Sequence, residues 1–112
     1  MDIFSNLAYT LYKENAECQG GSEVNQGRMA SLDDCATACY GVSDLFIYGT
    51  NDYSGYPPYC LDDGCYCHCE TNQDSSGDVT VCRGLAENAY RIYRFTNGKI
   101  ILFLEMYVMV TT

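Results

Sequence analysis

The residues best suited to chemistry in this chain are its eight cysteines and its single histidine. Three cysteines alternate in Cys65-Tyr-Cys-His-Cys69, and with Cys60 they offer four thiolates to a metal ion. Protein metal sites, however, favour Cys-x-x-Cys pairs that are matched by further Cys or His pairs. The sequence has no Cys-x-x-Cys motif, and its only histidine is His68. We therefore expect disulfides, and neither a metal nor a cofactor. The cysteines concerned are Cys18, Cys35, Cys39, Cys60, Cys65, Cys67, Cys69 and Cys82.

His68 also has the neighbours of a Cys–His nucleophile pair, since it follows Cys67 and precedes Cys69. Both cysteines are expected in disulfides, and on an extended strand the imidazole points to the opposite face from their sulfurs. The sequence offers no second histidine and no general base at a recognisable spacing. We therefore expect His68 to be an exposed surface residue, and we expect no catalytic residue and no enzyme.

A loop rich in tyrosine and proline is the best candidate for ligand recognition. Tyr53, Tyr56 and Tyr59 lie around the stiff pair Pro57-Pro58. Tyrosine rings offer a large amphipathic surface at a low entropy cost, which suits the binding of proteins or sugars. The alternative is that this loop packs its rings onto its own sheet.

The polar stretch 72–77, Asn-Gln-Asp-Ser-Ser-Gly, is faintly similar to a calcium-binding loop. Such a loop needs a bidentate acid at its twelfth position. That position is Arg83, which cannot ligate calcium. We therefore expect a solvated loop here.

Composition limits the partners and the compartment. The 112 residues include 15 Asp and Glu but only 6 Lys and Arg, which gives a formal net charge of −9. Nucleic-acid binding depends mostly on Lys and Arg, so no nucleic-acid partner is expected. No run of about 18 apolar residues is present, so no helix should span a membrane. An even number of cysteines in a short acidic chain is typical of a secreted, disulfide-stapled domain.

One helix is predicted at about residues 32–40. Ser31 can cap its free N–H groups, and Asp33 and Asp34 place negative charge at the positive end of the helix dipole. Leu32, Cys35, Ala36 and Cys39 recur at spacings of three and four and so define one apolar face. Gly41 is the expected terminator.

Strands and loops are predicted around this helix. Alternating or β-branched and aromatic stretches predict strands, and Gly-rich polar stretches predict loops. The predicted strands are 7–12, 45–48, 64–70 and 90–95, and the predicted loops are 19–30, 51–58 and 71–78. In the strand 64–70, the three cysteines share one face, and Tyr66, His68 and Glu70 share the other.

The two ends of the sequence differ in composition from the middle. Residues 1–8 lack the basic start and the apolar run of a signal peptide. Because we expect a secreted protein, we interpret the sequence either as a mature fragment with an added Met or as a gene model that lacks its first exon. Residues 98–112 are apolar from Ile100 to Val110 except for Glu105. This tail is interpreted as an edge strand, a partner-binding segment, an aggregation-prone segment or a translation that does not belong to the natural protein, and we favour the last.

Geometry removes some of the 105 pairings that eight cysteines allow. Alternate residues on one strand lie roughly 6.5–7 Å apart with parallel side chains, whereas a disulfide needs Cα atoms roughly 4.4–6.8 Å apart and converging Cβ vectors. No bond is therefore expected among Cys65, Cys67 and Cys69. Cys35 and Cys39 lie one helical turn apart and should not pair either.

The middle of the chain resembles the PAN/Apple domain family. The resemblance covers about Leu7 to Phe95, and it is carried by Cys18, Ser31-Leu-Asp-Asp-Cys-Ala-Thr-Ala-Cys39, Phe46-Ile-Tyr48, Cys65-Tyr-Cys-His-Cys69 and Tyr90-Arg-Ile-Tyr-Arg-Phe95. It implies a curved antiparallel sheet around one helix, disulfides that tie the helix to the sheet, and adjacent terminal strands. The related WSC carbohydrate-binding domain is a second resemblance.

The resemblance also implies disulfide partners. It implies a disulfide between Cys35 and a cysteine of the strand that contains Cys65, Cys67 and Cys69. The family's usual partner for the second helical cysteine is replaced here by Asp44-Leu45, so Cys39 is expected to pair with Cys60 or with that same strand. Cys18 and Cys82 either pair with each other or share the remaining strand cysteines.

Together these observations predict a small α+β domain over residues 7–97, followed by the tail 98–112. By resemblance it is a non-catalytic extracellular recognition module that binds a carbohydrate or a protein, within a larger secreted or surface protein. The candidate ligand-binding loop is that of Tyr53, Tyr56 and Tyr59. The alternative is a secreted cysteine-rich inhibitor or toxin-like effector.

Overall fold

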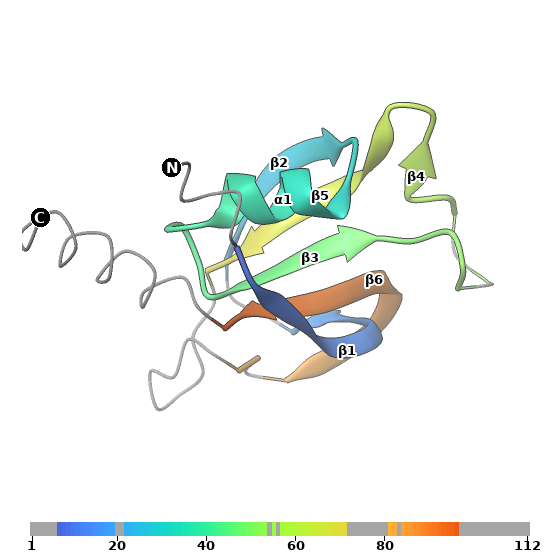
Figure 1. Cartoon of the computed structure of the whole chain (residues 1–112). Coiled ribbons are helices and arrows are strands. Elements are labelled where there is room, and N and C mark those ends of the chain that lie inside the picture. Colours follow the sequence, from blue (N-terminus) through green and yellow to red (C-terminus); the bar gives the residue numbers. More distant parts are fainter. Residues whose placement is uncertain are drawn as a thin grey trace, which may run out of the picture.

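The computed structural model describes residues 7–19, 22–53, 55, 57–71, 81–82 and 84–96. Antiparallel strand pairing organises this part of the chain. This part forms a small disulfide-rich α+β domain (Figure 1). Its elements, in chain order, are β1 (Tyr9–Cys18), β2 (Glu23–Met29), α1 (Leu32–Cys39), β3 (Leu45–Gly49), β4 (Cys60–Leu61), β5 (Gly64–Glu70) and β6 (Leu85–Phe95).

The sheet has the strand order β1-β6-β3-β5-β2, with β4 paired to β5. Every neighbouring pair is antiparallel. The first and last strands, β1 and β6, are therefore adjacent, and they form a long twisted ribbon on one side of the molecule (Figure 1). The strands β3 and β5 occupy the middle, where they position the cysteines of β5 beneath the helix.

Helix α1 forms where the sequence predicts it. The Ser31 side chain accepts a hydrogen bond from the Asp34 backbone N–H at 3.1 Å, and the helix ends at Cys39, before Gly41. Its buried residues are Cys35, Ala36 and Cys39, which is the apolar face that the spacing predicts. This face packs across β2, β3 and β5.

The two faces of the sheet carry separate cores. On the helix face, Phe46 is fully buried among the cysteines of α1 and β5, and the rings of Tyr9, Tyr93 and Phe95 surround it at centroid distances of 4.9–5.4 Å to Phe46. On the far face, the buried core consists of Ala16, Cys18, Leu45, Ile47, Tyr90 and Ile92. Because side chains alternate between the two faces along β3, Phe46 lies in one core and its neighbours Leu45 and Ile47 lie in the other.

The prediction of a loop over residues 19–30 is wrong, because Glu23–Met29 forms β2. This strand pairs with β5, and a register shift between Asn25 and Arg28 accommodates the polar Gly-containing stretch. Gly27 has a φ of +75° and donates its N–H to Asn25 Oδ1 at 2.7 Å. The local sequence favours a turn at this position. In the structure this turn is a bulge within β2, because pairing with β5 makes the rest of the segment a strand.

The terminal strands are longer than predicted. Strand β1 runs to Cys18 and β6 begins at Leu85, because the two pair along their length with irregularities near Tyr12 and Asn15. The strands β3 and β5 confirm the predictions for 45–48 and 64–70. The predicted tail 98–112 and all of the loop 71–78 except Thr71 lie outside the described residues. Within the described part, no helix is long and apolar enough to cross a membrane.

Candidate functional site

All eight cysteines form disulfides, and the pairings agree with the exclusions drawn from geometry. No bond joins two of the three alternating cysteines, and none joins Cys35 to Cys39. The bonds are Cys18–Cys82, Cys35–Cys67, Cys39–Cys69 and Cys60–Cys65. Two of them therefore fasten α1 to β5, as the resemblance implies, with Cα separations of 5.6 and 5.2 Å.

The four cysteines that the sequence offered to a metal ion, Cys60, Cys65, Cys67 and Cys69, are all bonded in disulfides. The sulfurs of Cys35, Cys39 and Cys67 lie within 4.8 Å of one another, which by itself is a ligand-like spacing. Each of them is already bonded to another sulfur, so none offers a thiolate.

The hairpin formed by β4 and β5 carries a run of exposed residues, Leu61, Asp62 and Asp63. It closes with the two-residue turn Asp62-Asp63, and Cys60 lies directly opposite Cys65 in the ladder. Gly64 has a φ of +123°, and a Cβ atom at that position would collide with the carbonyl of Met29. Glycine is therefore required where the hairpin passes closest to the end of β2.

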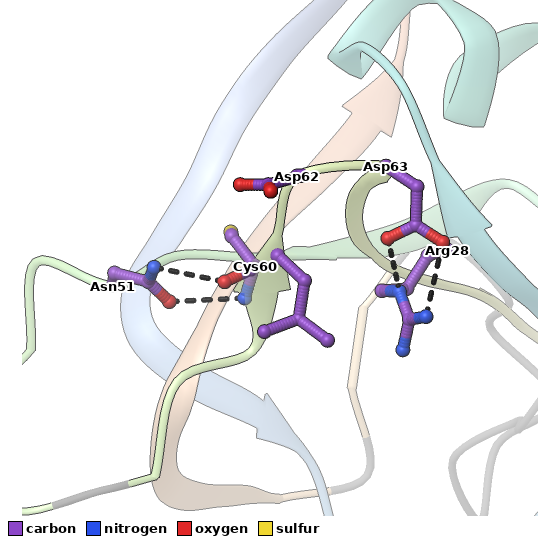
Figure 2. Close-up of a pocket in the computed structure, with 6 residues that line it drawn as sticks. Arg28, Asn51, Cys60, Asp62 and Asp63 are labelled. Atoms are coloured by element: carbon purple, nitrogen blue, oxygen red, sulfur yellow. Dashed lines mark hydrogen bonds and ion pairs between the residues drawn. The ribbon is translucent and has the colours of Figure 1, made fainter.

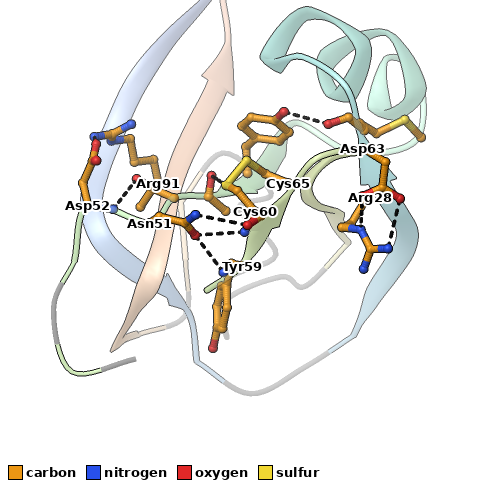
Figure 3. Close-up of a disulfide and its surroundings, with 12 residues drawn as sticks. Arg28, Asn51, Asp52, Tyr59, Cys60, Asp63, Cys65 and Arg91 are labelled. Atoms are coloured by element: carbon orange, nitrogen blue, oxygen red, sulfur yellow. Dashed lines mark hydrogen bonds and ion pairs between the residues drawn. A yellow bond between two sulfur atoms is a disulfide. The ribbon is translucent and has the colours of Figure 1, made fainter. Parts of the chain in front are cut away.

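Asn51 fixes the base of this hairpin. Its side-chain Oδ1 accepts hydrogen bonds from the backbone N–H groups of Tyr59 and Cys60 at 3.0 and 2.9 Å, and its Nδ2 donates to the Cys60 carbonyl at 3.1 Å (Figure 3). One amide side chain thus satisfies three backbone groups where the chain enters β4. The Cys60–Cys65 disulfide closes the same base covalently (Figure 3).

Arg28 of β2 fixes the tip. Its Nε and Nη2 donate to the two carboxylate oxygens of Asp63 at 2.6 and 3.0 Å (Figure 2). The guanidinium carbon also lies 5.7 Å from the centre of the Tyr66 ring. The hydrogen bond from Arg28 holds the pKa of Asp63 below its usual value. The bidentate geometry orients the turn, although an exposed pair of this kind adds little stability.

Between these two restraints lies an open hollow of about 600 Å³. Its lining residues are Arg28, Asn51, Cys60, Leu61, Asp62 and Asp63 (Figure 2). Leu61 is 55% exposed, the highest value among the large apolar side chains of the described part. The hollow therefore combines one apolar side chain with two carboxylates on a backbone that is held from both ends.

The candidate tyrosine loop reaches this site only in part. The Tyr59 hydroxyl donates to Asn88 Oδ1 at 2.7 Å, and its ring packs against Tyr90 at 4.7 Å and Tyr66 at 6.0 Å. Tyr59 thus packs on its own sheet, which is the alternative that the sequence left open. The Tyr53 hydroxyl bonds the Glu87 carboxylate, and Tyr56 lies outside the described residues.

The expectation that His68 is an exposed surface residue is wrong. Only 12% of its side chain is exposed, and its ring meets Tyr90 edge to face at 5.7 Å. The alternation along β5 places His68 on the far face as predicted, but β1 and β6 cover that face. Nothing in the local sequence shows that this cover exists.

Glu70 is the residue that sequence reasoning missed. It is 2% exposed, and it lies beside Glu23, its partner in the β2–β5 ladder. Burial, followed by the neighbouring Glu23 carboxylate and the more distant Glu17, raises the pKa of Glu70 to about 9. Its glutamate identity and its place next to a predicted loop favour a solvated side chain, so no local pattern reveals the burial.

Comparison of the chain with protein-family models, with curated proteins and with solved structures finds no match. The class that the fold defines is therefore a disulfide-rich α+β domain with one helix on an antiparallel sheet. Its four disulfides are consistent with an oxidising, extracellular environment.

Proposed function

We propose that this domain is a non-catalytic extracellular recognition module that binds a protein partner through the β4–β5 hairpin. The observation that carries the proposal is the combination of restraint and exposure at this hairpin. A disulfide, the Asn51 clamp and the Arg28–Asp63 pair hold its backbone, while Leu61 stays largely exposed at its end.

Such preorganisation favours binding because the loop loses little conformational entropy when a partner arrives. Exposed apolar side chains on rigid elements are suited to fill a pocket on a partner. Here Leu61 supplies the apolar contact, and Asp62 supplies negative charge beside it, whereas the neighbouring Asp63 is paired with Arg28 (Figure 2).

The charge distribution favours a basic partner. Arg28 pairs with Asp63, Arg91 pairs with Asp52 at 2.9 Å, and the Arg94 guanidinium lies over the Tyr12 ring. These cations are engaged within the domain, and the chain carries a net charge of −9. Electrostatic complementarity accelerates encounter with a positively charged surface and disfavours anionic ligands such as sulfated glycans.

We further propose that the domain is PAN/Apple-like. Three features support this assignment: one helix lying on an antiparallel sheet, two disulfides from that helix to a central strand, and adjacent terminal strands. Domains of that family bind proteins or carbohydrates, which makes a glycan the main competitor to a protein partner.

The test is to probe arrays of extracellular proteins and of glycans with the oxidised domain and two matched variants. Leu61→Ser removes the exposed apolar side chain of the hairpin, and Val42→Ser removes one that is 46% exposed after the helix. We expect a protein ligand whose binding is lost in Leu61→Ser and kept in Val42→Ser. Binding only to glycans, or equal loss in both variants, would contradict the proposal.

The same hairpin supports a second candidate function, that of a secreted inhibitor. A disulfide-closed, exposed loop with an apolar side chain is suited to occupy a protease cleft in one conformation. Inhibition of a serine protease by the wild-type domain, with loss of inhibition in Leu61→Ser, would favour this function over recognition without inhibition.

A further inference from the structure

The four disulfides differ in how deeply they are buried. The two bonds between α1 and β5 join cysteines that are all fully buried, and in Cys18–Cys82 the first cysteine is buried. In Cys60–Cys65, by contrast, both residues are partly exposed. Thiol–disulfide exchange needs direct access of a thiolate to a sulfur atom. A reductant in solution therefore meets the hairpin disulfide first.

The length of chain that each bond closes points the same way. Cys60–Cys65 spans a sequence separation of 5 residues, whereas the other three bonds span separations of 64, 32 and 30. A disulfide stabilises the fold more when it closes a longer loop, and by linkage the fold protects that disulfide from reduction to the same extent. The hairpin disulfide thus receives the least protection from the fold.

The hairpin keeps its hydrogen bonds when this disulfide opens. The Asn51 side chain holds the backbone of Tyr59 and Cys60, and the Tyr66 N–H donates to the Tyr59 carbonyl at 3.1 Å. The Cys60 sulfur lies 3.5 Å from the Gly49 carbonyl oxygen, to which a thiol can donate a hydrogen and a disulfide sulfur cannot. These contacts stabilise the reduced form, and a disulfide whose reduced form is stabilised is reduced more easily.

Cys35 on the helix face shows that such a contact is not sufficient. Its sulfur also lies 3.5 Å from a carbonyl oxygen, that of Ile47. Cys35 is fully buried in the helix-face core, so a thiolate reaches it only when that core opens. Cys60 instead lines the open hollow beside the hairpin, and Cys65 is not among the residues of that lining (Figures 2 and 3).

We propose that Cys60–Cys65 is a site of thiol–disulfide exchange for a protein dithiol, and that its reduction loosens the hairpin. A thiolate of the dithiol attacks the Cys60 sulfur from the hollow. A bond forms between these two sulfurs, the Cys60–Cys65 bond breaks, and Cys65 leaves as a thiolate that takes up a proton. The second thiol of the reductant then loses its proton and attacks the reductant's sulfur in the mixed disulfide, and Cys60 leaves in the same way. The domain gains two electrons and two protons, and the dithiol becomes a disulfide.

Reduction has a consequence for recognition. It removes the covalent closure from the base of the hairpin, while Leu61 stays exposed at its end. A hairpin with more conformational freedom must be ordered when a partner binds, and this ordering lowers the affinity. The loss of affinity rests on the proposed function, whereas the exchange reaction does not.

The exchange reaction is tested on the full oxidised chain, with thioredoxin as the dithiol and alkylation of the thiols that appear. We expect peptide mapping to show Cys60 and Cys65 labelled at least tenfold faster than any other cysteine, with an unchanged circular dichroism spectrum. A thioredoxin variant that lacks its second cysteine should remain bonded to Cys60. Faster labelling of another pair, labelling of all eight cysteines together, no labelling before denaturant is added, or a bond to Cys65 would overturn the proposal.

The matched control is Cys60→Ala/Cys65→Ala, which keeps the other three disulfides. Under the same conditions we expect no labelled thiol in this variant, and labelling at the wild-type rate would contradict the assignment of the site. The map of the wild-type protein decides the matter even if the variant fails to fold.

The loosening of the hairpin is tested on the reduced domain, prepared without oxygen. Backbone NMR relaxation should show residues 61–64 to be more mobile than in the oxidised domain, and unchanged relaxation would overturn this part of the proposal. Any protein ligand found on the array should bind the reduced domain at least fivefold more weakly, and equal binding would contradict the regulation. If the oxidised domain binds no protein on the array, the proposed function fails, while labelling and relaxation still decide the exchange reaction and the loosening.

Discussion

The two faces of the sheet are closed by different physical means. On the helix face, two disulfides and a group of aromatic rings enclose a core around Phe46. On the far face, side chains of β1, β3 and β6 and the Cys18–Cys82 disulfide form an apolar core, and His68 and Glu70 of β5 lie on the same face. Both faces are held covalently, because the Cys18–Cys82 disulfide fastens the far face, but only the far face also encloses a carboxyl group whose charge depends on pH.

This difference indicates where the domain is robust and where it responds to its surroundings. Disulfides restrict the unfolded chain, and they hold as long as the environment is oxidising. A buried carboxyl group, in contrast, makes the free energy of unfolding depend on pH. Disulfides on both faces therefore support the stability of the domain, and the far face adds a dependence on pH.

A large effect is expected from removing a helix-face disulfide, and a smaller one from removing the disulfide of the hairpin. The double variant Cys35→Ala/Cys67→Ala opens a loop closed over a separation of 32 residues, and we expect a loss of about 4 kcal/mol. The Cys60→Ala/Cys65→Ala variant opens a separation of only 5 residues and should lose about 2 kcal/mol. Urea unfolding of the two variants measures the difference. Equal losses would show that loop length does not govern these bonds.

A smaller effect is expected on the far face, where Glu70→Gln should raise stability above neutral pH. The folded-state pKa of about 9 lies above the ordinary value of 4.5 because Glu70 is buried beside Glu23. The protonated Glu70 carboxyl therefore contributes its full share of the free energy of unfolding below about pH 4.5, and this share is lost as the pH rises through about 9.

At pH 8, the amide of Glu70→Gln avoids this loss, and we expect a gain on the order of 2 kcal/mol relative to wild type. The two proteins should converge at pH 4. Thermal unfolding across this pH range measures whether Glu70→Gln is more or less stable than wild type at each pH. A wild-type stability that rises from pH 5 to pH 8 while Glu70→Gln stays flat would contradict the prediction.

The helix cap should have a moderate effect. Ser31→Ala removes the acceptor for the Asp34 N–H, and we expect a loss of about 1 kcal/mol. The matched control is Thr37→Ala, whose exposed hydroxyl bonds the Asp33 carbonyl within the helix and should matter less. Denaturant midpoints of both variants give the comparison. If Ser31→Ala is neutral, the disulfides alone determine the start of the helix.

The smallest effect is expected at the hairpin tip. Asp63→Asn weakens the bidentate contact with Arg28, and we expect little change in the free energy of unfolding because the pair is exposed. The contact should instead affect the order of the tip, which backbone NMR relaxation of residues 61–64 would measure. Unchanged relaxation together with a large loss of stability would contradict this prediction, because the pair would then stabilise the domain without ordering the tip.

The sequence predicts the elements that depend on local chemistry. The cap, the spacing of apolar residues and the terminal glycine locate α1, and the period of two in β5 separates its cysteines from Tyr66, His68 and Glu70. Strand geometry also excludes the disulfides that do not form. Each of these features follows from neighbours within a few residues, which is why the sequence is sufficient to predict it.

The candidate sites depend on contacts between distant segments, and the sequence does not reveal them. Asn51 clamps the base of the hairpin from eight or nine positions away in the chain, and Arg28 reaches Asp63 across 35 positions. Strand β2 forms from a stretch with loop-like propensity because β5 offers it a partner.

The sequence alone determined the chemistry of this domain: an even set of cysteines, an acidic surface, one capped helix and an alternating strand. Only the tertiary structure decided which of these groups are buried together. His68 and Glu70 lie inside because β1 and β6 fold across the far face, and the exposure of Leu61 follows from how β4 returns on β5. Burial depends on what covers a residue, and here the cover comes from strands far away in the chain.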